Sequence, residues 1–167
     1  MSAPRLYCPA LAIGELTLDE TEARHALRSL RLRPGDAVEL FDGRGNVAQG
    51  VLQPTDNDAP RAKKRTIAAV VAVERVTTVP APADSLTLLV AACKGARLDW
   101  MVEKCTELGV SRLMLTRFER SVVNPGETHL EKLRRTAIEA CKQCQRVWLP
   151  TIENAPDVET AAKPLAT

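Results

Sequence analysis

The side chains with the clearest chemical meaning in this sequence are arginines and lysines, which gather at three places along the chain. The first cluster has four arginines and no acid within ten residues: Arg24, Arg28, Arg31 and Arg33. The other two clusters lie in residues 61–65 and 132–146. A cation that contacts a nucleic-acid phosphate releases a counterion, so such clusters favour a phosphate backbone as partner. The alternative is a solvated basic face, and the net charge of +2 does not decide between them.

The pair Cys141 and Cys144 has the spacing of a thiol redox or metal-binding motif. A structural zinc site needs four ligands, but the sequence has no second pair of this kind, and its only histidines are His25 and His129. The chain has five cysteines, and an odd number without a secretory signal indicates reduced thiols. The pair also falls late in a helical pattern. We therefore expect buried thiols on a helix face and no metal, with metal or redox chemistry as the alternative.

Composition bounds the remaining possibilities. The chain has 167 residues, of which 45% are hydrophobic and 26% charged, as in globular proteins. Apolar runs reach about five residues, far below the roughly 20 that a membrane span needs, and no signal peptide opens the sequence. We expect a soluble, cytoplasmic protein. Aromatic residues make up only 3%, which argues against a stacking platform of several rings for single-stranded nucleic acid.

The first half is predicted to form several short strands and one helix. Asp19 is a predicted N-cap, with Glu22 three residues on as in a capping box. Apolar residues at helical spacing continue the helix toward a turn at residues 33–36, and Arg28 and Arg31, three apart, are expected to share a helix face. Strands are predicted at residues 37–41, 46–52 and 66–79, with a hairpin turn at 42–45. Together they predict a small β-barrel-like module.

In the second half of the sequence, the spacing of the apolar residues changes. Residues 80–84 alternate proline and alanine and form the expected linker. Strands are then predicted at residues 86–92, 112–118 and 149–152. Two helices are predicted between them. The first follows from the apolar stripe of Leu98, Met101, Val102, Cys105 and Leu108 and ends at Gly109. The second follows from the apolar stripe of Leu130, Leu133, Ala137, Ala140, Cys141 and Cys144. This β-α-β-α-β order predicts a parallel α/β layer. Ligands of such sheets gather at the carboxyl ends of the strands, which singles out Lys94 and Arg97.

Several short sequence strings match those of one known family and occur in the same order. They are HALRSLRLRPGD at 25–36, VELFDG at 38–43, RLDW at 97–100, KCTELGV at 104–110, FERSVV at 118–123 and EACKQCQR at 139–146. The chain resembles the ribosomal RNA small subunit methyltransferase E family over residues 5–150. The resemblance implies an α+β and α/β fold, with a PUA-like RNA-binding β-barrel at residues 1–79 and part of a SPOUT-type domain, of the trefoil-knot class, at residues 85–167.

The resemblance also implies an activity. Family members take part in ribosome biogenesis by methylating N3 of a uridine in 16S ribosomal RNA, with S-adenosylmethionine as cofactor, and the complete protein is expected to be a homodimer. The family's glycine-rich Gly-Pro-Glu-Gly-Gly loop and its Leu-Arg-x-Glu-Thr-Ala segment, which hold the cofactor, do not occur in this sequence. We therefore expect no cofactor-binding residues and no detectable activity in these 167 residues. A catalytically inactive RNA-binding fragment is the alternative function.

The expected RNA-binding residues follow from the strings and the predicted elements: Arg28, Arg31, Arg33, Lys94, Arg97, Arg120, Gln143 and Arg146. Arg120, after the second strand of the parallel layer, is the first candidate near the reaction, and no catalytic residue is otherwise assigned. Each has an alternative. Arg120 could pair with Glu119 or Glu107, and Lys94 could neutralise a turn. Gln143 and Arg146 could line either the target pocket or a dimer seam. For Glu107 we expect an ion pair with Lys104 rather than a role as a base.

Overall fold

The computed structural model describes residues 3–55, 67–119, 126–155 and 157–162. The chain divides into two compact units, Met1–Ala81 and Pro82–Thr167. The division falls within the predicted linker at residues 80–84. Arg120 and the basic cluster at 61–65 lie outside the described residues. Among the helices that are described, none is long and apolar enough to cross a membrane.

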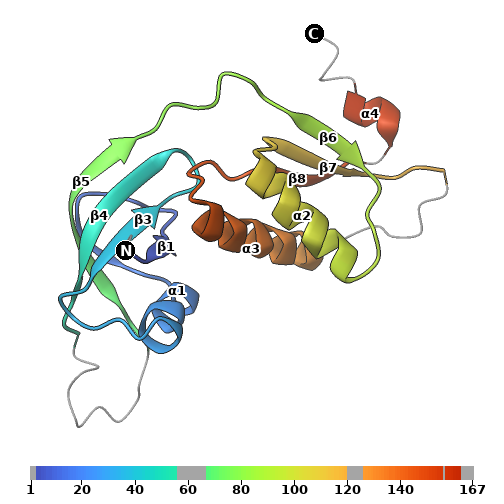
Figure 1. The fold of residues 1–167 in the computed structure, drawn as a ribbon. Helices are drawn as coiled ribbons and strands as arrows, with labels where there is room; N and C mark the ends of the chain where they lie inside the picture. Colours follow the sequence, from blue (N-terminus) through green and yellow to red (C-terminus); the bar gives the residue numbers. More distant parts are fainter. Residues whose placement is uncertain (1–2, 56–66, 120–125, 156, 163–167) are drawn as a thin grey trace. The chain divides into compact units, whose positions relative to one another are not determined.

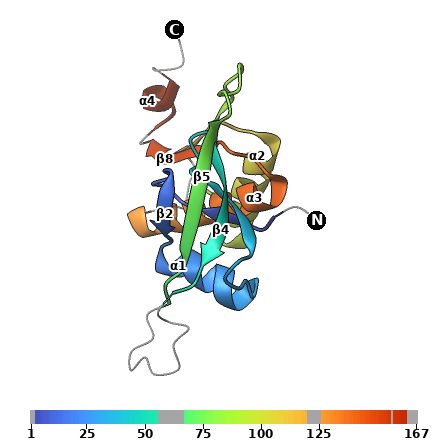
Figure 2. The same cartoon turned by 90° about the vertical axis from the view of Figure 1, so that its left-hand side faces the viewer.

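The first unit is built on one five-stranded sheet. Its strands are β1 (Arg5–Tyr7), β2 (Gly14–Thr17), β3 (Ala37–Phe41), β4 (Asn46–Gln53) and β5 (Val70–Thr78). The spatial order is β1-β3-β4-β5-β2, with β1 and β3 parallel and the other pairs antiparallel. Figure 2 shows β5 lying between β4 and β2. The predicted β-barrel-like module is thus a mixed sheet, and the predicted hairpin at 42–45 joins β3 to β4.

Buried Asp42 (6% exposed) explains why that hairpin forms. Its carboxylate accepts hydrogen bonds from the backbone N–H of Arg44, at 2.7 Å, and of Asn46, at 3.0 Å. The Asn46 side chain donates a third bond to the same carboxylate at 2.6 Å. A buried carboxylate is stable only when its oxygens are bonded, and here the turn supplies the donors.

The helical segment after Asp19 begins as predicted and ends differently. Asp19 accepts a hydrogen bond from the backbone N–H of Glu22 at 2.9 Å and so caps α1 (Glu20–Arg24). The carboxylate of Glu22 also accepts a hydrogen bond from the backbone N–H of Tyr7 at 3.0 Å, which connects the helix to β1. The chain then continues as a π-helix, η1 (His25–Ser29), and not as an α-helix up to the turn at 33–36.

Arg31 lies two residues beyond the end of η1 at Ser29, so the prediction that it shares a helix face with Arg28 is wrong. Its φ of 57° lies in the left-handed region, and the backbone N–H of Leu32 bonds back to the carbonyl of Ala26 at 3.0 Å. Left-handed residues commonly end helices because they turn the chain back over the last carbonyls. The predicted turn at 33–36 does form, and Asp36 accepts from the backbone N–H of Arg33 at 2.7 Å.

The second unit contains the predicted parallel layer. Its strands β6 (Thr87–Val90), β7 (Arg112–Thr116) and β8 (Thr151–Ala155) lie side by side in the order β6-β7-β8, and both pairs are parallel. The helices are α2 (Ala96–Leu108), α3 (Glu127–Cys144) and the short α4 (Val158–Ala162). The β-α-β-α-β order and the mixed α/β fold class are confirmed. The observed strands differ at their ends from the predicted ranges: β7 stops at Thr116 rather than at Phe118.

Side chains along β7 point alternately to the two faces of the sheet, so the core of this unit is divided between those faces. Leu113 and Leu115 pack with Leu98, Val102 and Leu133, from α2 and α3, on one face of the sheet. Met114 points to the other face, where it packs with residues of β8 and α4. Figure 1 shows α2 and α3 on one side of this sheet and α4 on the other. One residue of the predicted α2 stripe is misplaced: Leu108 is 80% exposed, because it lies in the last turn before Gly109.

Candidate functional site

Three of the predicted RNA-contacting arginines lie on the surface of the first unit. Arg28, Arg31 and Arg33 are all exposed. None of their guanidinium groups forms an ion pair with a carboxylate in the described part of the chain. Arg24 differs, because it pairs with Glu20 at 2.7 Å. The three arginines after Arg24 therefore carry charge that no described acid neutralises, which is what a surface that binds phosphates requires.

A second set of cations lies at the carboxyl edge of the parallel sheet. Lys94 and Arg97 follow β6, and Arg117 follows β7 directly. The two strands are neighbours in register, with Val90 opposite Leu115, so the segments that leave them begin side by side. All three side chains are exposed, and no carboxylate of the described residues pairs with them. The edge where ligands of α/β sheets bind is therefore cationic.

Two other cations of this unit are neutralised. Arg112, at the start of β7, binds Glu153 of β8, with its Nε donating at 2.6 Å. Lys132 of α3 binds Asp99 of α2 at 2.7 Å. The uncompensated charge of the sheet therefore lies at one end of the strands and not along their whole length.

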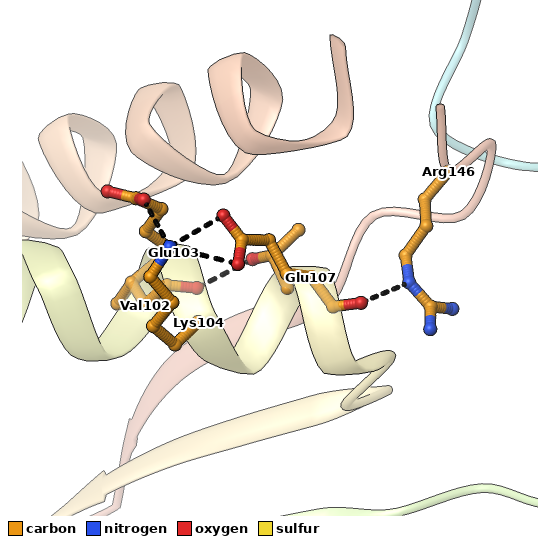
Figure 3. A network of polar contacts seen from close by, with 6 residues as sticks. Val102, Glu103, Lys104, Glu107 and Arg146 are labelled. Carbon is orange, nitrogen blue, oxygen red and sulfur yellow. Dashed lines mark hydrogen bonds and ion pairs between the residues drawn. The ribbon is translucent and has the colours of Figure 1, made fainter. Parts of the chain in front are cut away.

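Helix α2 carries a polar network, shown in Figure 3. The ammonium group of Lys104 lies 2.7 Å from the carboxylate of Glu103 and 2.9 Å from that of Glu107. Hydrogen bonding to Lys104 holds the pKa of Glu103 below its usual range, and the bond to Glu103 is the main reason that the pKa of Lys104 is raised. The predicted ion pair between Lys104 and Glu107 is confirmed.

Gln143 and Arg146 lie in different surroundings. Gln143 lines a groove of about 500 Å³ between α2 and α3, together with Glu103, Glu107, Lys132, Arg135 and Glu139. Arg146 lies at the end of α2, where its Nε donates to the backbone carbonyl of Glu107 at 3.0 Å (Figure 3). That contact gives Arg146 a helix-capping role, whereas the predicted RNA or dimer contact of either residue stays a prediction.

The cysteine pair lies in the last turns of α3. Cys141 is fully buried, and Cys144 is half-buried. The Sγ of Cys141 lies 3.9 Å from the backbone carbonyl oxygen of Trp148. In the described residues, no group of three or more histidine, cysteine or acidic side chains is arranged to hold a metal ion. The positions fit the expectation of helix-face thiols.

Sequence reasoning missed Arg117 and Phe118. It placed both inside a strand, but β7 ends at Thr116, and Phe118 is 39% exposed. The usable signal was the end of the apolar run at Thr116, since a buried parallel strand rarely continues through an arginine. Arg120, the first candidate from the sequence, lies outside the described residues and stays a prediction.

Family models match both units. A model described as an RNA methyltransferase domain matches residues 80–167, which is just over half of the chain. A model described as an RNA methyltransferase PUA domain matches residues 18–64.

Individual relatives agree with these models. The ribosomal RNA small subunit methyltransferase E of Synechocystis is 31% identical over 137 residues, which cover 82% of this chain and 42% of that protein. A probable rRNA methyltransferase from Porphyromonas gingivalis superposes with a TM-score of 0.78 at 29% identity, covering 95% of this chain and 62% of that one. The ribosomal RNA small subunit methyltransferase E of Neisseria gonorrhoeae, solved bound to S-adenosyl methionine, has a TM-score of 0.75 at 26% identity, over 94% and 62%. The chain spans about half the length of the curated relatives that it matches.

Proposed function

We infer the function of this chain from its family: it belongs to the RNA methyltransferases typified by ribosomal RNA small subunit methyltransferase E. We propose that it acts in methylation of N3 of a uridine in 16S ribosomal RNA, with S-adenosylmethionine as methyl donor. Within that reaction the chain supplies the RNA-docking surface and the sheet edge that receives the acceptor nucleotide. A cytoplasmic location goes with such a substrate.

The observation that carries this proposal is the uncompensated cationic edge formed by Lys94, Arg97 and Arg117. Uridine N3 carries a proton at neutral pH and is a poor nucleophile until that proton leaves. Fixed positive charge close to the base stabilises the resulting anion and lowers the pKa of N3. The same cations hold the adjacent phosphates, which positions the base.

The methyl donor itself does not suit this edge. When bound, S-adenosylmethionine supplies an electrophilic methyl group on a positively charged sulfonium sulfur. Lys94, Arg97 and Arg117 would repel that charge, so the described residues do not fit the cofactor. They fit the phosphates and the anionic base of the acceptor instead. We therefore expect the 167 residues alone to bind RNA without binding the cofactor.

The exposed arginines of the first unit support a docking role. We expect salt-sensitive binding of a 16S ribosomal RNA fragment, measured by fluorescence anisotropy over a range of salt concentrations. Replacing Arg28, Arg31 and Arg33 together by alanine would leave up to three phosphates without a cation. The slope of the logarithm of the binding constant against the logarithm of the salt concentration would then be less steep by roughly 0.9 for each such phosphate. The matched control is Arg24→Ala with Arg44→Ala, because Arg24 is paired with Glu20 and Arg44 donates to the carbonyl of Pro9.

Three outcomes would contradict parts of the proposal. A chain that binds no ribosomal RNA at low salt is not an RNA-docking unit. Micromolar binding of S-adenosylmethionine in calorimetry would contradict our account of the cofactor. After incubation of chain, cofactor and 16S ribosomal RNA, mass spectrometry of the nucleosides should show no new methylation. Any methylated nucleoside other than 3-methyluridine would rule out the proposed acceptor atom.

For the complete protein we further propose a homodimer. Two large apolar side chains of α2 support this, since Trp100 is 63% exposed and Leu108 is 80% exposed. Exposed tryptophan is enriched at the centres of protein interfaces. Light scattering tests it: a mass near twice 18.2 kDa for this chain would support the dimer. Substitution of Trp100 by alanine should then return the mass to that of one chain. A dimer that survives this substitution does not use α2.

A further inference from the structure

We propose that Arg117 and Phe118 form a binding site for one nucleotide of single-stranded RNA at the carboxyl end of β7. The Phe118 ring stacks on the base, and the Arg117 guanidinium binds the phosphate of the same nucleotide or of its neighbour. The inference rests on the proposed function, from which it takes RNA as the partner. It adds the place on the sheet where an unpaired nucleotide is held and the two side chains that hold it.

The position of the two residues is the first reason. β7 is the central strand of the layer, between β6 and β8, and Arg117 and Phe118 are the first residues beyond its carboxyl end (Figure 1). The chain that leaves the adjacent strand β6 leads to Lys94 and Arg97. A nucleotide bound at Arg117 and Phe118 would therefore have two further cations on the neighbouring strand's side for the phosphates that flank it.

The exposure of Phe118 is the second reason. The chain has two phenylalanines, and the other, Phe41, is fully buried against Arg5 and Tyr7 in the first unit. Phe118 is 39% exposed although the core of the second unit lies directly behind it on the strand. A partly exposed aromatic residue that follows an arginine in the chain can supply both contacts of a nucleotide, because every base has a π-face and a phosphate attached.

The charge of Arg117 is the third reason. Arg112, at the other end of the same strand, is neutralised by Glu153, whereas no carboxylate of the described residues pairs with Arg117. An uncompensated guanidinium next to an exposed ring fits a nucleotide better than an apolar peptide, which would supply no anion. A protein partner would bind through the ring and be insensitive to the loss of Arg117.

The test uses the full chain and a fluorescent ten-nucleotide oligouridylate, with a second oligonucleotide of the same length that keeps the ribose-phosphate backbone but lacks the bases. Phe118→Ala should weaken binding of oligouridylate about tenfold, the size of a single stacking contact. The same substitution should leave binding of the abasic strand unchanged. Phe118→Trp should restore the affinity for oligouridylate, since it restores the ring. Arg117→Ala should weaken binding of both strands. It should also make the slope of the logarithm of the binding constant against the logarithm of the salt concentration less steep by about 0.7.

Matched controls separate a local effect from a general one. Leu86→Ala removes an exposed apolar side chain of the same unit, and Arg134→Ala removes an exposed arginine that pairs with Glu127. Neither should change either affinity by more than about twofold.

Each remaining outcome overturns the site in a recognisable way. Equal losses on both strands in Phe118→Ala would exclude stacking, and an unchanged affinity in both variants would exclude the site. If RNA binding survives these two substitutions but is lost when Arg28, Arg31 and Arg33 are replaced, the inference fails and the proposed function stands. If the unaltered chain binds no RNA, both fail together.

Discussion

Gly109 and Arg146 form one helix-ending unit, although 36 residues separate them in the sequence. Gly109 has a φ of 86° and ends α2 in the left-handed conformation. The guanidinium of Arg146 occupies the space that a Cβ at position 109 would need, and its Nε donates to the carbonyl of Glu107 at 3.0 Å. The glycine therefore permits both the turn and the close approach of the cation to the negative end of the helix.

We expect Gly109→Ala to lower the free energy of unfolding by about 1–2 kcal/mol, because an L-residue in the left-handed region is strained and the added Cβ displaces Arg146. Arg146→Ala should cost about 1 kcal/mol, because it removes the hydrogen bond to Glu107. In the double variant the second change should cost almost nothing, because Gly109→Ala has already broken that bond. Urea unfolding of the four proteins measures this cycle. Strict additivity would show that the two residues act independently.

The control for this cycle is Arg135→Ala, an exposed cation of α3. It should change the free energy of unfolding by less than about 0.5 kcal/mol, as surface substitutions generally do.

Arg31 gives a prediction in which stability and binding move in opposite directions. Its φ of 57° strains a residue that has a Cβ, so Arg31→Gly should raise the free energy of unfolding by about 0.5–1 kcal/mol. The same change removes an exposed cation and should weaken binding of ribosomal RNA. Arg31→Ala should weaken binding equally without the gain in stability. Thermal unfolding and anisotropy on the same samples check both. A loss of stability in Arg31→Gly would mean that the arginine side chain itself supports the fold.

The first unit shows what local sequence could and could not predict. The N-cap at Asp19 and the hairpin at 42–45 depend on residues within four positions of each other, and both form. The end of the helical segment was predicted wrongly, because no pattern of apolar residues distinguishes a π-helix from an α-helix at this length. The hydrogen bond between the Glu22 carboxylate and Tyr7 could not be predicted, because Tyr7 lies on a distant strand that only the fold brings close.

The second unit shows the same limit at its candidate site. Long apolar runs and helical stripes are strong signals, so the strand and helix order of the layer could be predicted. The capping role of Arg146 depends on a contact with Glu107 that no spacing in the sequence reveals. Arg117 and Phe118 were missed because the position of the strand end decides whether they lie inside the sheet or beyond it. β7 ends two residues earlier than predicted, so Arg117 and Phe118 lie beyond the strand and not inside it.

Gly50 is expected to be the least replaceable glycine of the first sheet. It follows the register shift between β4 and β5, and a Cβ there would lie 2.9 Å from the backbone oxygen of Ala72 and closer still to the side chain of Val71. Backbone cannot move aside as a flexible side chain does, so Gly50→Ala should cost about 2 kcal/mol. Gly126→Ala, at the start of α3, meets no atom within 4 Å and should be nearly neutral. Urea midpoints compare the two, and equal midpoints would contradict the predicted clash.

The thiols of buried Cys8 and half-buried Cys105 predict that the stability of the fold depends on pH. Burial is the main cause of the raised pKa of Cys8 and of Cys105, so the folded protein keeps both protonated at pH values where the unfolded chain ionises them. The unfolded state then binds fewer protons than the folded state. The free energy of unfolding should therefore fall as the pH rises above about 8.5, the ordinary pKa of a thiol, and continue to fall up to the raised pKa of the folded state.

Alkylation by iodoacetamide, read residue by residue with mass spectrometry, tests the same pKa shifts without unfolding the protein. Only the thiolate reacts, so at pH 8.5 the folded chain should be modified first at exposed Cys93 and much more slowly at Cys8 and Cys105. In urea the three sites should react at similar rates, because burial no longer favours the protonated form. Cys105→Ala should make the pH dependence of stability shallower. If Cys105 reacts as fast as Cys93 in the folded chain, burial does not control its ionisation.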